Sequence, residues 1–241
     1  MISLKEILFT FVPVVLLFTG GMIAFFKPPG QALKSVILHF AAGVVFSVVA
    51  VELLPDMIRI HDPKSIIIGF TTGVAAMLLI KHFTGKIQSE NKPESVKTLP
   101  WGILTAVGVD LFIDGMLLGI GFAAGEKEGI LLAIALALEC FSLGMATVTT
   151  LLGTASSQKS VNLILVGLAM VFILGSALGL LLLHNTSETV LELILSFGSA
   201  ALLFLVTEEL LVEAHEQKER AVYTASFFAG FLIFMILGMV L

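Results

Sequence analysis

Long apolar segments separated by short polar breaks run along the whole chain. A membrane-spanning helix needs about 20 mostly apolar residues, and breaks at charged residues, proline and glycine divide this sequence into eight such segments. The predicted helices cover residues 4–26, 36–58, 65–83, 99–124, 129–152, 161–183, 190–213 and 221–241. The pattern predicts an all-α, polytopic membrane protein, a single transmembrane domain over residues 1–241 with its longest polar loop at 84–98.

Composition excludes most soluble classes of protein. Hydrophobic residues make up 58% of the chain and charged residues 13%, whereas a soluble domain is about one quarter charged. A net charge of -5 without a long basic cluster argues against a nucleic-acid partner. The single cysteine, Cys140, excludes an intramolecular disulfide framework. The first apolar segment is as long as a full span and lacks a small-residue cleavage site, so we interpret it as a helix and not as a removable signal peptide.

Basic residues are distributed unevenly between the two sets of loops. If both termini are external, nine of the thirteen basic residues lie in the inner loops, which favours that orientation under the positive-inside rule. The inner set is Lys27, Lys34, Lys81, Lys86, Lys92, Lys97, Lys159, Lys218 and Arg220, and the outer set is Lys5, Arg59, Lys64 and Lys127. The loop at 84–98 is then predicted to be cytoplasmic.

Two short elements occur twice, each time on predicted helices that run in opposite directions. Glu52-Leu-Leu-Pro-Asp56 in the second helix resembles Glu209-Leu-Leu-Val-Glu213 in the seventh. In the fourth and fifth helices, Asp110 and Glu139 are each followed by Phe two residues later and by Gly five residues later. Such pairs are typical of inverted-repeat transporters, which bind substrate near the midplane, although short matches also arise by chance.

Three acidic residues lie near the middle of predicted helices. Asp110 and Asp114 are one turn apart on one face of the fourth helix, and Glu139 is central in the fifth. Each charged carboxylate at the bilayer centre costs about 2.5–3.5 kcal/mol even on the lenient insertion scale. Lysine and arginine are confined to helix ends and loops. The compensating positive charge must therefore come from protons, with each acid hydrogen-bonded to a neighbour, or from a bound cation.

Oxygen-rich sites favour hard or borderline divalent cations. Ser142, one turn from Glu139, could add a hydroxyl ligand or bond back to its own helix. Cys140 points about 100° away from Glu139 around the helix and is interpreted as a packing residue. Glu208 and Glu209 are adjacent, so at most one of them should face the site. Glu52, in the matching element of the second helix, is the remaining candidate ligand.

Polar clusters also flank the two predicted mouths, where acidic groups would concentrate cations or simply be solvated at helix ends. The outer cluster is Asp56, His61 and Asp62, and the inner cluster is Glu213, His215, Glu216 and Glu219. Three further histidines fit the membrane interface better than a metal role: His39, His82 and His184.

These motifs together resemble the ZIP (Zrt/Irt-like) family of metal transporters over nearly the whole chain. The segments that carry the resemblance are AAGVVFSVVAVELLPD, VDLFIDGMLLGIGFAAG, LLAIALALECFSLGMA and FLVTEELLVEA. The family's fourth-helix motif, His-Asn-x-x-acid-Gly, falls on Asp110 to Gly115. Its fifth-helix motif, His-Glu-x-Pro-Glu-Gly, falls on Glu139 to Gly144.

The sequence departs from the family pattern where metal is bound. Both motif histidines are carboxylates here, and the positions associated with a second metal are Leu111, Cys140 and Leu143. The resemblance implies metal binding by Asp110, Asp114 and Glu139, with Glu209 matching the family's seventh-helix acid. A site of one ion is therefore expected, harder than a zinc site with imidazole ligands and better suited to Mn²⁺ or Fe²⁺.

The expected function is transport of a divalent transition metal of the zinc, iron or manganese class by alternating access, and the resemblance implies import. A proton-coupled carrier of a non-metal solute and a non-transporting metal sensor or scaffold remain open. An intramembrane hydrolase is disfavoured, because two aspartates one turn apart leave little room for a substrate, so no enzyme is expected. No cofactor is expected, the metal being the substrate. The expected partners are the metal ion and the lipid bilayer of a prokaryotic plasma (inner) membrane, and a homodimer is left open.

Overall fold

The computed structural model describes residues 4–27, 30–60, 62–90, 100–153, 157–183, 188–215 and 220–240. Every regular element in these ranges is helical, and eight helices are long and apolar enough to span a membrane. Two of the eight contain a π-helical turn, named η1 and η2. The elements are α1 (Leu4–Phe26), α2 (Gln31–Val48), η1 (Val49–Leu53), α3 (Leu54–Ile60), α4 (Pro63–Glu90), α5 (Trp101–Ala124), α6 (Glu126–Gly153), α7 (Gln158–Leu183), α8 (Glu188–Leu205), η2 (Val206–Leu210), α9 (Leu211–Ala214) and α10 (Ala221–Val240).

The predicted eight-helix, all-α membrane fold is confirmed, but two boundaries were wrong by five residues or more: the second predicted helix begins at Gln31 and not at residue 36, and the third continues beyond residue 83. The long loop does not begin at residue 84, because α4 continues to Glu90. Thr84 accommodates its hydroxyl within the helix by donating a hydrogen bond to the Ile80 carbonyl at 2.9 Å. The polar residues after it are helix-compatible, and the first proline of this segment is Pro93. Polarity alone therefore marked the end of the apolar stretch and not the end of the helix.

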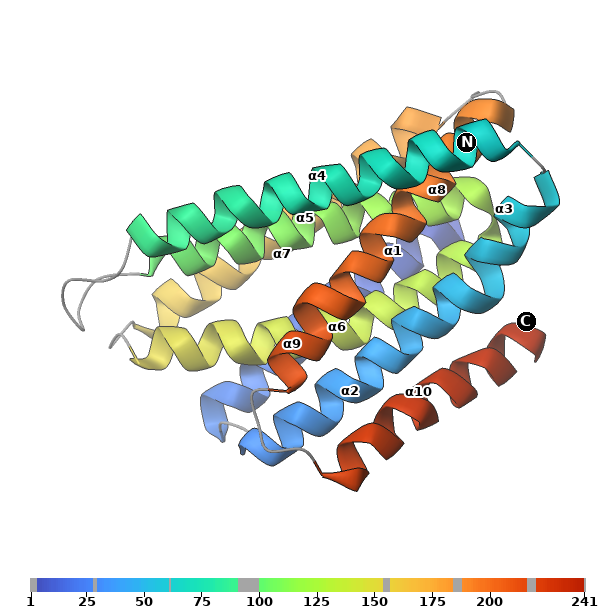
Figure 1. The fold of residues 1–241 in the computed structure, drawn as a ribbon. Coiled ribbons are helices and arrows are strands. Elements are labelled where there is room, and N and C mark those ends of the chain that lie inside the picture. Colours follow the sequence, from blue (N-terminus) through green and yellow to red (C-terminus); the bar gives the residue numbers. More distant parts are fainter. Residues whose placement is uncertain are drawn as a thin grey trace.

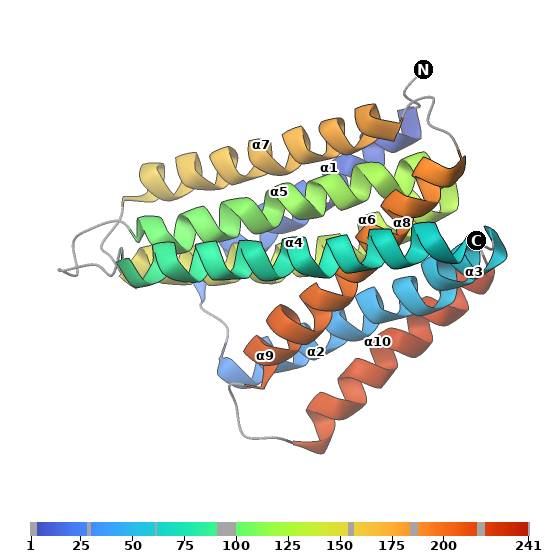
Figure 2. The same ribbon diagram turned by 45° about the horizontal axis from the view of Figure 1, so that its top comes forward.

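Four helices form the centre of the bundle and four cover its outside (Figures 1 and 2). The central set, α2, α5, α6 and α8, carries most of the buried residues. Each outer helix packs mainly on one central helix: α1 on α6, α7 on α5, α10 on α2, and α4 on α8. The outer helices consequently present long rows of exposed apolar side chains, as lipid contact requires.

Glycines bring the paired backbones into close contact. A Cβ on Gly175 of α7 would meet the carbonyl oxygen of Phe112 in α5, and a Cβ on Gly20 of α1 would meet that of Phe141 in α6. Phe112 and Phe141 occupy the same place in the two repeated motifs, two residues after the acid. The α5–α7 and α1–α6 contacts are therefore built alike, with small residues permitting the close approach.

The two π-helical turns provide a second equivalence between the halves of the chain. η1 begins three residues before Glu52, and η2 begins three residues before Glu209. Both turns fall on the repeated acid-Leu-Leu element, and π-helical turns are frequent at functional sites. The symmetry replaces α1, α2, α4 and α5 by α7, α8, α10 and α6, respectively, and vice versa. The α1–α6 pair then becomes α7–α5 and the α10–α2 pair becomes α4–α8, so the same four helix pairings result. The bundle is thus an inverted repeat, as the sequence echoes predicted.

The two ends of the bundle differ in what they carry. α1 begins and α10 ends at one end, whereas α4 ends and α5 begins at the opposite end (Figures 1 and 2). At the bundle end where the chain termini lie, the Asp62 carboxylate caps the start of α4. It accepts hydrogen bonds from the Ser65 hydroxyl at 2.7 Å and from the Lys64 amide at 3.2 Å. The Ser65 hydrogen bond lowers the pKa of Asp62. This carboxylate therefore has a structural role at the start of a helix.

Candidate metal centre

Three carboxylates converge between the middles of α5 and α6. Asp110 and Asp114 are residues 10 and 14 of the 24-residue α5, and Glu139 is residue 14 of the 28-residue α6. The four-residue spacing places both aspartates on one face of α5. One oxygen from each of the three side chains lies within 4.8 Å of the other two. The structure therefore brings together the three central acids that the sequence singled out.

The spacing of these oxygens suits one small cation. Three points no more than 4.8 Å apart all lie within about 2.8 Å of a common centre, while carboxylate oxygens bind Zn²⁺ at about 2.0–2.2 Å. Movements of each oxygen by about 0.6–0.8 Å would close that difference. Two ions in a binuclear centre sit about 3.5–4 Å apart and need further ligands. Within the described ranges, no other group of three or more His, Cys, Asp or Glu side chains converges in this way.

Two of the three acids are buried and incompletely hydrogen-bonded. Asp114 is 1% exposed and Glu139 is 2% exposed, and Asp114 Oδ2 and Glu139 Oε2 find no hydrogen-bond partner among the described residues. Lys34, Lys81 and Lys127 form ion pairs with acids outside the cluster. Buried polar oxygens normally have partners, so these two carboxylate oxygens are available to hold a proton or to ligate a cation.

Helix η2 sends its two adjacent glutamates to different places. Glu209 hydrogen-bonds through its side chain to Asp110. Glu208 turns outward and pairs with Lys81 of α4 at 2.6 Å, where both side chains are 47% exposed. The expectation that at most one of the two faces the site is therefore confirmed. Glu209 stands beside the cluster at its more exposed edge, since Asp110 is only partly buried.

A cavity of about 370 Å³ reaches the cluster from one side. Asp110 and Glu209 line its inner part, and Lys81, Thr84 and Gly85 line it near the end of α4. Lys81 and Gly85 are exposed. The cavity therefore leads from the bundle end opposite the chain termini to the edge of the carboxylate cluster. Its walls are otherwise apolar, contributed by α4 and α5.

The other side of the cluster is sealed by apolar packing. Beyond Asp114 along α5, Leu117 and Ile120 meet Leu132 of α6 and Leu202 of α8 around a void of only about 10 Å³. A void of about that size holds at most one water molecule. The cavity therefore approaches the carboxylates from one end of the bundle, and packed apolar side chains lie on their other side.

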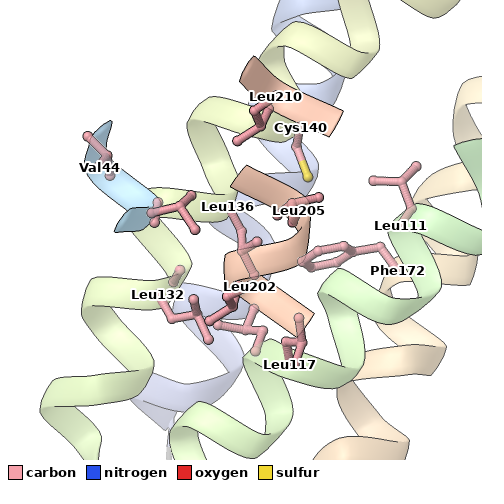
Figure 3. Close-up of a cluster of buried hydrophobic side chains, with 14 of the residues drawn as sticks. Val44, Leu111, Leu117, Leu132, Leu136, Cys140, Phe172, Leu202, Leu205 and Leu210 are labelled. Atoms are coloured by element: carbon pink, nitrogen blue, oxygen red, sulfur yellow. The ribbon is translucent and has the colours of Figure 1, made fainter. Parts of the chain in front are cut away.

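The other residues considered in the sequence analysis have different surroundings. Glu52 pairs with Lys127 at 3.2 Å, so the structure does not bring it to the carboxylates. Ser142 is buried on α6 beside Glu139 in sequence. Cys140 packs among leucines of α6, α8 and η2 (Figure 3), in agreement with its interpretation as a packing residue. Leu111 is fully buried near Phe172 (Figure 3) and offers no lone pair to a second ion.

Several mouth residues fall in parts that the structure does not describe. His61, His184, Glu216 and Glu219 lie outside the described residues, as does the side chain of Asp56. Glu213 of α9 pairs with Lys34 at 2.6 Å.

The structure buries two polar residues that the sequence analysis did not expect to be buried. Glu192, near the start of α8, is 0% exposed, and its Oε1 accepts a hydrogen bond from the Asp62 amide at 3.3 Å. His39, interpreted as interfacial, is 4% exposed inside α2. The one available signal was the repeat: 157 residues separate Glu52 from Glu209, and the same offset links Ser35 to Glu192 and His39 to Ser196.

The fold and the cluster define an integral membrane protein with a carboxylate centre at the middle of an inverted repeat. A sequence profile described as the ZIP zinc transporter family matches residues 82–238, well over half of the chain. The chain therefore belongs to the ZIP family of metal transporters. A comparison with curated proteins finds no match.

Proposed function

We propose that this chain imports a divalent transition-metal ion by alternating access, holding one ion at a time between Asp110, Asp114 and Glu139. The observation that carries the proposal is the convergence of three carboxylates in the bundle centre, two of them with orphaned oxygens. A dication would supply the charge that neighbouring side chains do not provide. All three ligands come from one chain, so a single transmembrane domain suffices for binding.

The direction of access fits release towards the cytoplasm. The positive-inside bias supports external termini and a cytoplasmic end for α4. The cavity lined by Lys81 and Thr84 then opens inward, and the seal around Leu117 and Leu202 closes the outer side. We infer that this conformation is the inward-facing one. Glu209, between cavity and cluster, is placed to receive the ion as it leaves Asp110.

The ligand chemistry favours oxygen-preferring ions. The three ligands are carboxylates, and the described residues place no histidine with them. Imidazole and thiolate ligands favour zinc and copper, whereas carboxylates suit Mn²⁺ and Fe²⁺. We therefore propose that Mn²⁺ or Fe²⁺ is carried at least as well as Zn²⁺, with the inner membrane of a prokaryote as the location.

Uptake by proteoliposomes tests the proposal. Purified protein is reconstituted, and entry of Mn²⁺, Fe²⁺, Zn²⁺ and Ca²⁺ is followed with a fluorescent indicator in the lumen. We expect saturable uptake of transition metals that is lost in Asp114→Asn and retained in His82→Gln, whose site on α4 is exposed. Binding without uptake would support the sensor or scaffold alternative. Absence of both binding and uptake would contradict the proposal.

A further inference from the structure

A group of aromatic and polar side chains lies away from the carboxylates, where α2, α9 and α10 meet. His39 of α2 is buried, and His215, just after α9, is exposed. Their ring centroids are 4.9 Å apart with an angle of 59° between the planes. The ring of Tyr223 in α10 stacks on the His39 ring, with the two ring centroids 5.7 Å apart. This group lies at the same end of the bundle as the cavity mouth.

Hydrogen bonds fix the tautomer of His39. Its Nδ1 lies 2.8 Å from the Ser35 carbonyl oxygen, which can only accept a hydrogen bond. The Ser35 hydroxyl lies 3.4 Å from the same nitrogen, but its own hydrogen is donated to the Ala214 carbonyl at 2.8 Å. Nδ1 must therefore carry the hydrogen. In the neutral ring, Nε2 is left with a free lone pair.

The same reasoning applies to His215. Its Nδ1 lies 2.6 Å from the Leu211 carbonyl oxygen, again a pure acceptor. Nδ1 carries the hydrogen and Nε2 keeps its lone pair. Among the described residues, neither Nε2 has a hydrogen-bond partner. Two adjacent imidazoles are thus both held with Nδ1–H bound to a backbone carbonyl, the arrangement that orients a histidine for metal ligation through Nε2.

We propose that His39 and His215 form a second binding site, an imidazole site for a borderline divalent cation such as Zn²⁺. Zinc binds imidazole nitrogen at about 2.0–2.1 Å, so rings whose centroids are 4.9 Å apart are within reach of one ion. Exposure of His215 gives the ion access and leaves room for water as further ligand. Imidazole selects a softer ion than the carboxylate cluster does.

The position of this pair relates it to the transport path. Glu209, Glu213 and His215 follow one another along η2 and α9 towards the bundle end, and Glu209 touches the carboxylate cluster. The imidazole site therefore lies at the bundle end towards which the cavity opens, and a role in ion release rests on the proposed function. Binding itself does not depend on that role, because the two histidines are separate from Asp110, Asp114 and Glu139.

Zinc binding to a protein without a working carboxylate centre tests the inference. The full chain, purified without a histidine tag, carries Asp114→Asn and Glu139→Gln, and bound Zn²⁺ is counted by equilibrium dialysis and metal analysis. We expect about one ion per chain to remain. Adding His215→Gln should lower the affinity at least 10-fold, whereas the matched control His82→Gln should leave the affinity unchanged. X-ray absorption at the zinc edge should detect two imidazole ligands.

The outcomes separate this site from the transport function. His215 is exposed, so its replacement disturbs little packing; His39→Gln provides the second variant, and the thermal unfolding temperature reports whether the fold is intact. Residual Zn²⁺ binding that survives both histidine substitutions would overturn the inference. So would a correctly folded carboxylate variant that binds no Zn²⁺. Failure of the proposed function would appear separately, as undiminished metal uptake by the Asp114→Asn, Glu139→Gln protein.

Discussion

Substituting Gly175 by alanine should displace α5, the helix that carries Asp110 and Asp114, without changing either carboxylate. The added Cβ would lie far inside van der Waals contact of the Phe112 carbonyl oxygen in α5. An ordinary contact requires the backbones to separate by on the order of 1 Å, and overpacking of this kind typically costs about 1–3 kcal/mol. Gly167, on the same helix, has no atom within 4 Å of the corresponding position. Gly167→Ala is therefore the matched control.

The free-energy cost of overpacking at Gly175 predicts a clear difference in thermal stability between Gly175→Ala and Gly167→Ala. For a chain of this size, 1 kcal/mol corresponds to about 2–4 °C in unfolding temperature. We expect Gly175→Ala to unfold about 2–12 °C below the native protein. Gly167→Ala should unfold at the native temperature or slightly above it, because alanine is the better helix former. The single tryptophan, Trp101, provides a fluorescence signal in detergent.

We expect metal affinity to fall in the same variants that lose thermal stability. Phe112 lies between Asp110 and Asp114, so a shift of α5 misplaces both carboxylates, and metal affinity should fall in Gly175→Ala but not in Gly167→Ala. The inverted repeat predicts the same result for Gly20→Ala, which would meet the Phe141 carbonyl beside Glu139. Equal unfolding temperatures for the variants at 167 and 175 would refute the packing argument.

Two further predictions concern topology and protons. A cysteine placed at Ser89 in a Cys140→Ser background should resist an impermeant thiol reagent added to intact cells and react after the membrane is opened; strong labelling from outside would reverse the orientation. Metal affinity should decline steadily from neutral to mildly acidic pH, because carboxylates must be deprotonated to bind metal and binding releases protons; titration of binding at a series of pH values checks this, and a flat profile would speak against carboxylate ligands.

Apolar length and acid spacing made much of the fold and site predictable. The eight spans follow from runs of about 20 apolar residues. The four-residue spacing of Asp110 and Asp114 placed both on one face, and burial of unpaired charge singled out Glu139. The repeated elements matched helices that the structure relates by an inverted repeat, down to equivalent glycine contacts at Gly20 and Gly175.

Other features depend on contacts that sequence spacing does not encode. Glu52 resembles Glu209 in sequence, yet it pairs with Lys127 on a different helix. The π-helical turns η1 and η2 rotate the residues that follow them, which ordinary helical periodicity cannot anticipate. The burial of His39 depends on the packing of Tyr223 and His215, both about 180 residues away along the chain. The length of α4 depended on helix propensity beyond the apolar segment.

Counting the ions bound at the bundle centre tests the central claim most directly. Crystals of the protein grown with Mn²⁺ and measured by anomalous diffraction should show one ion, ligated by Asp110, Asp114 and Glu139, and Asp114→Asn should abolish that peak while the fold is retained. Any ion at His39 and His215 would give a separate peak. Two fully occupied ions at the centre, or an undiminished central peak in Asp114→Asn, would contradict the account.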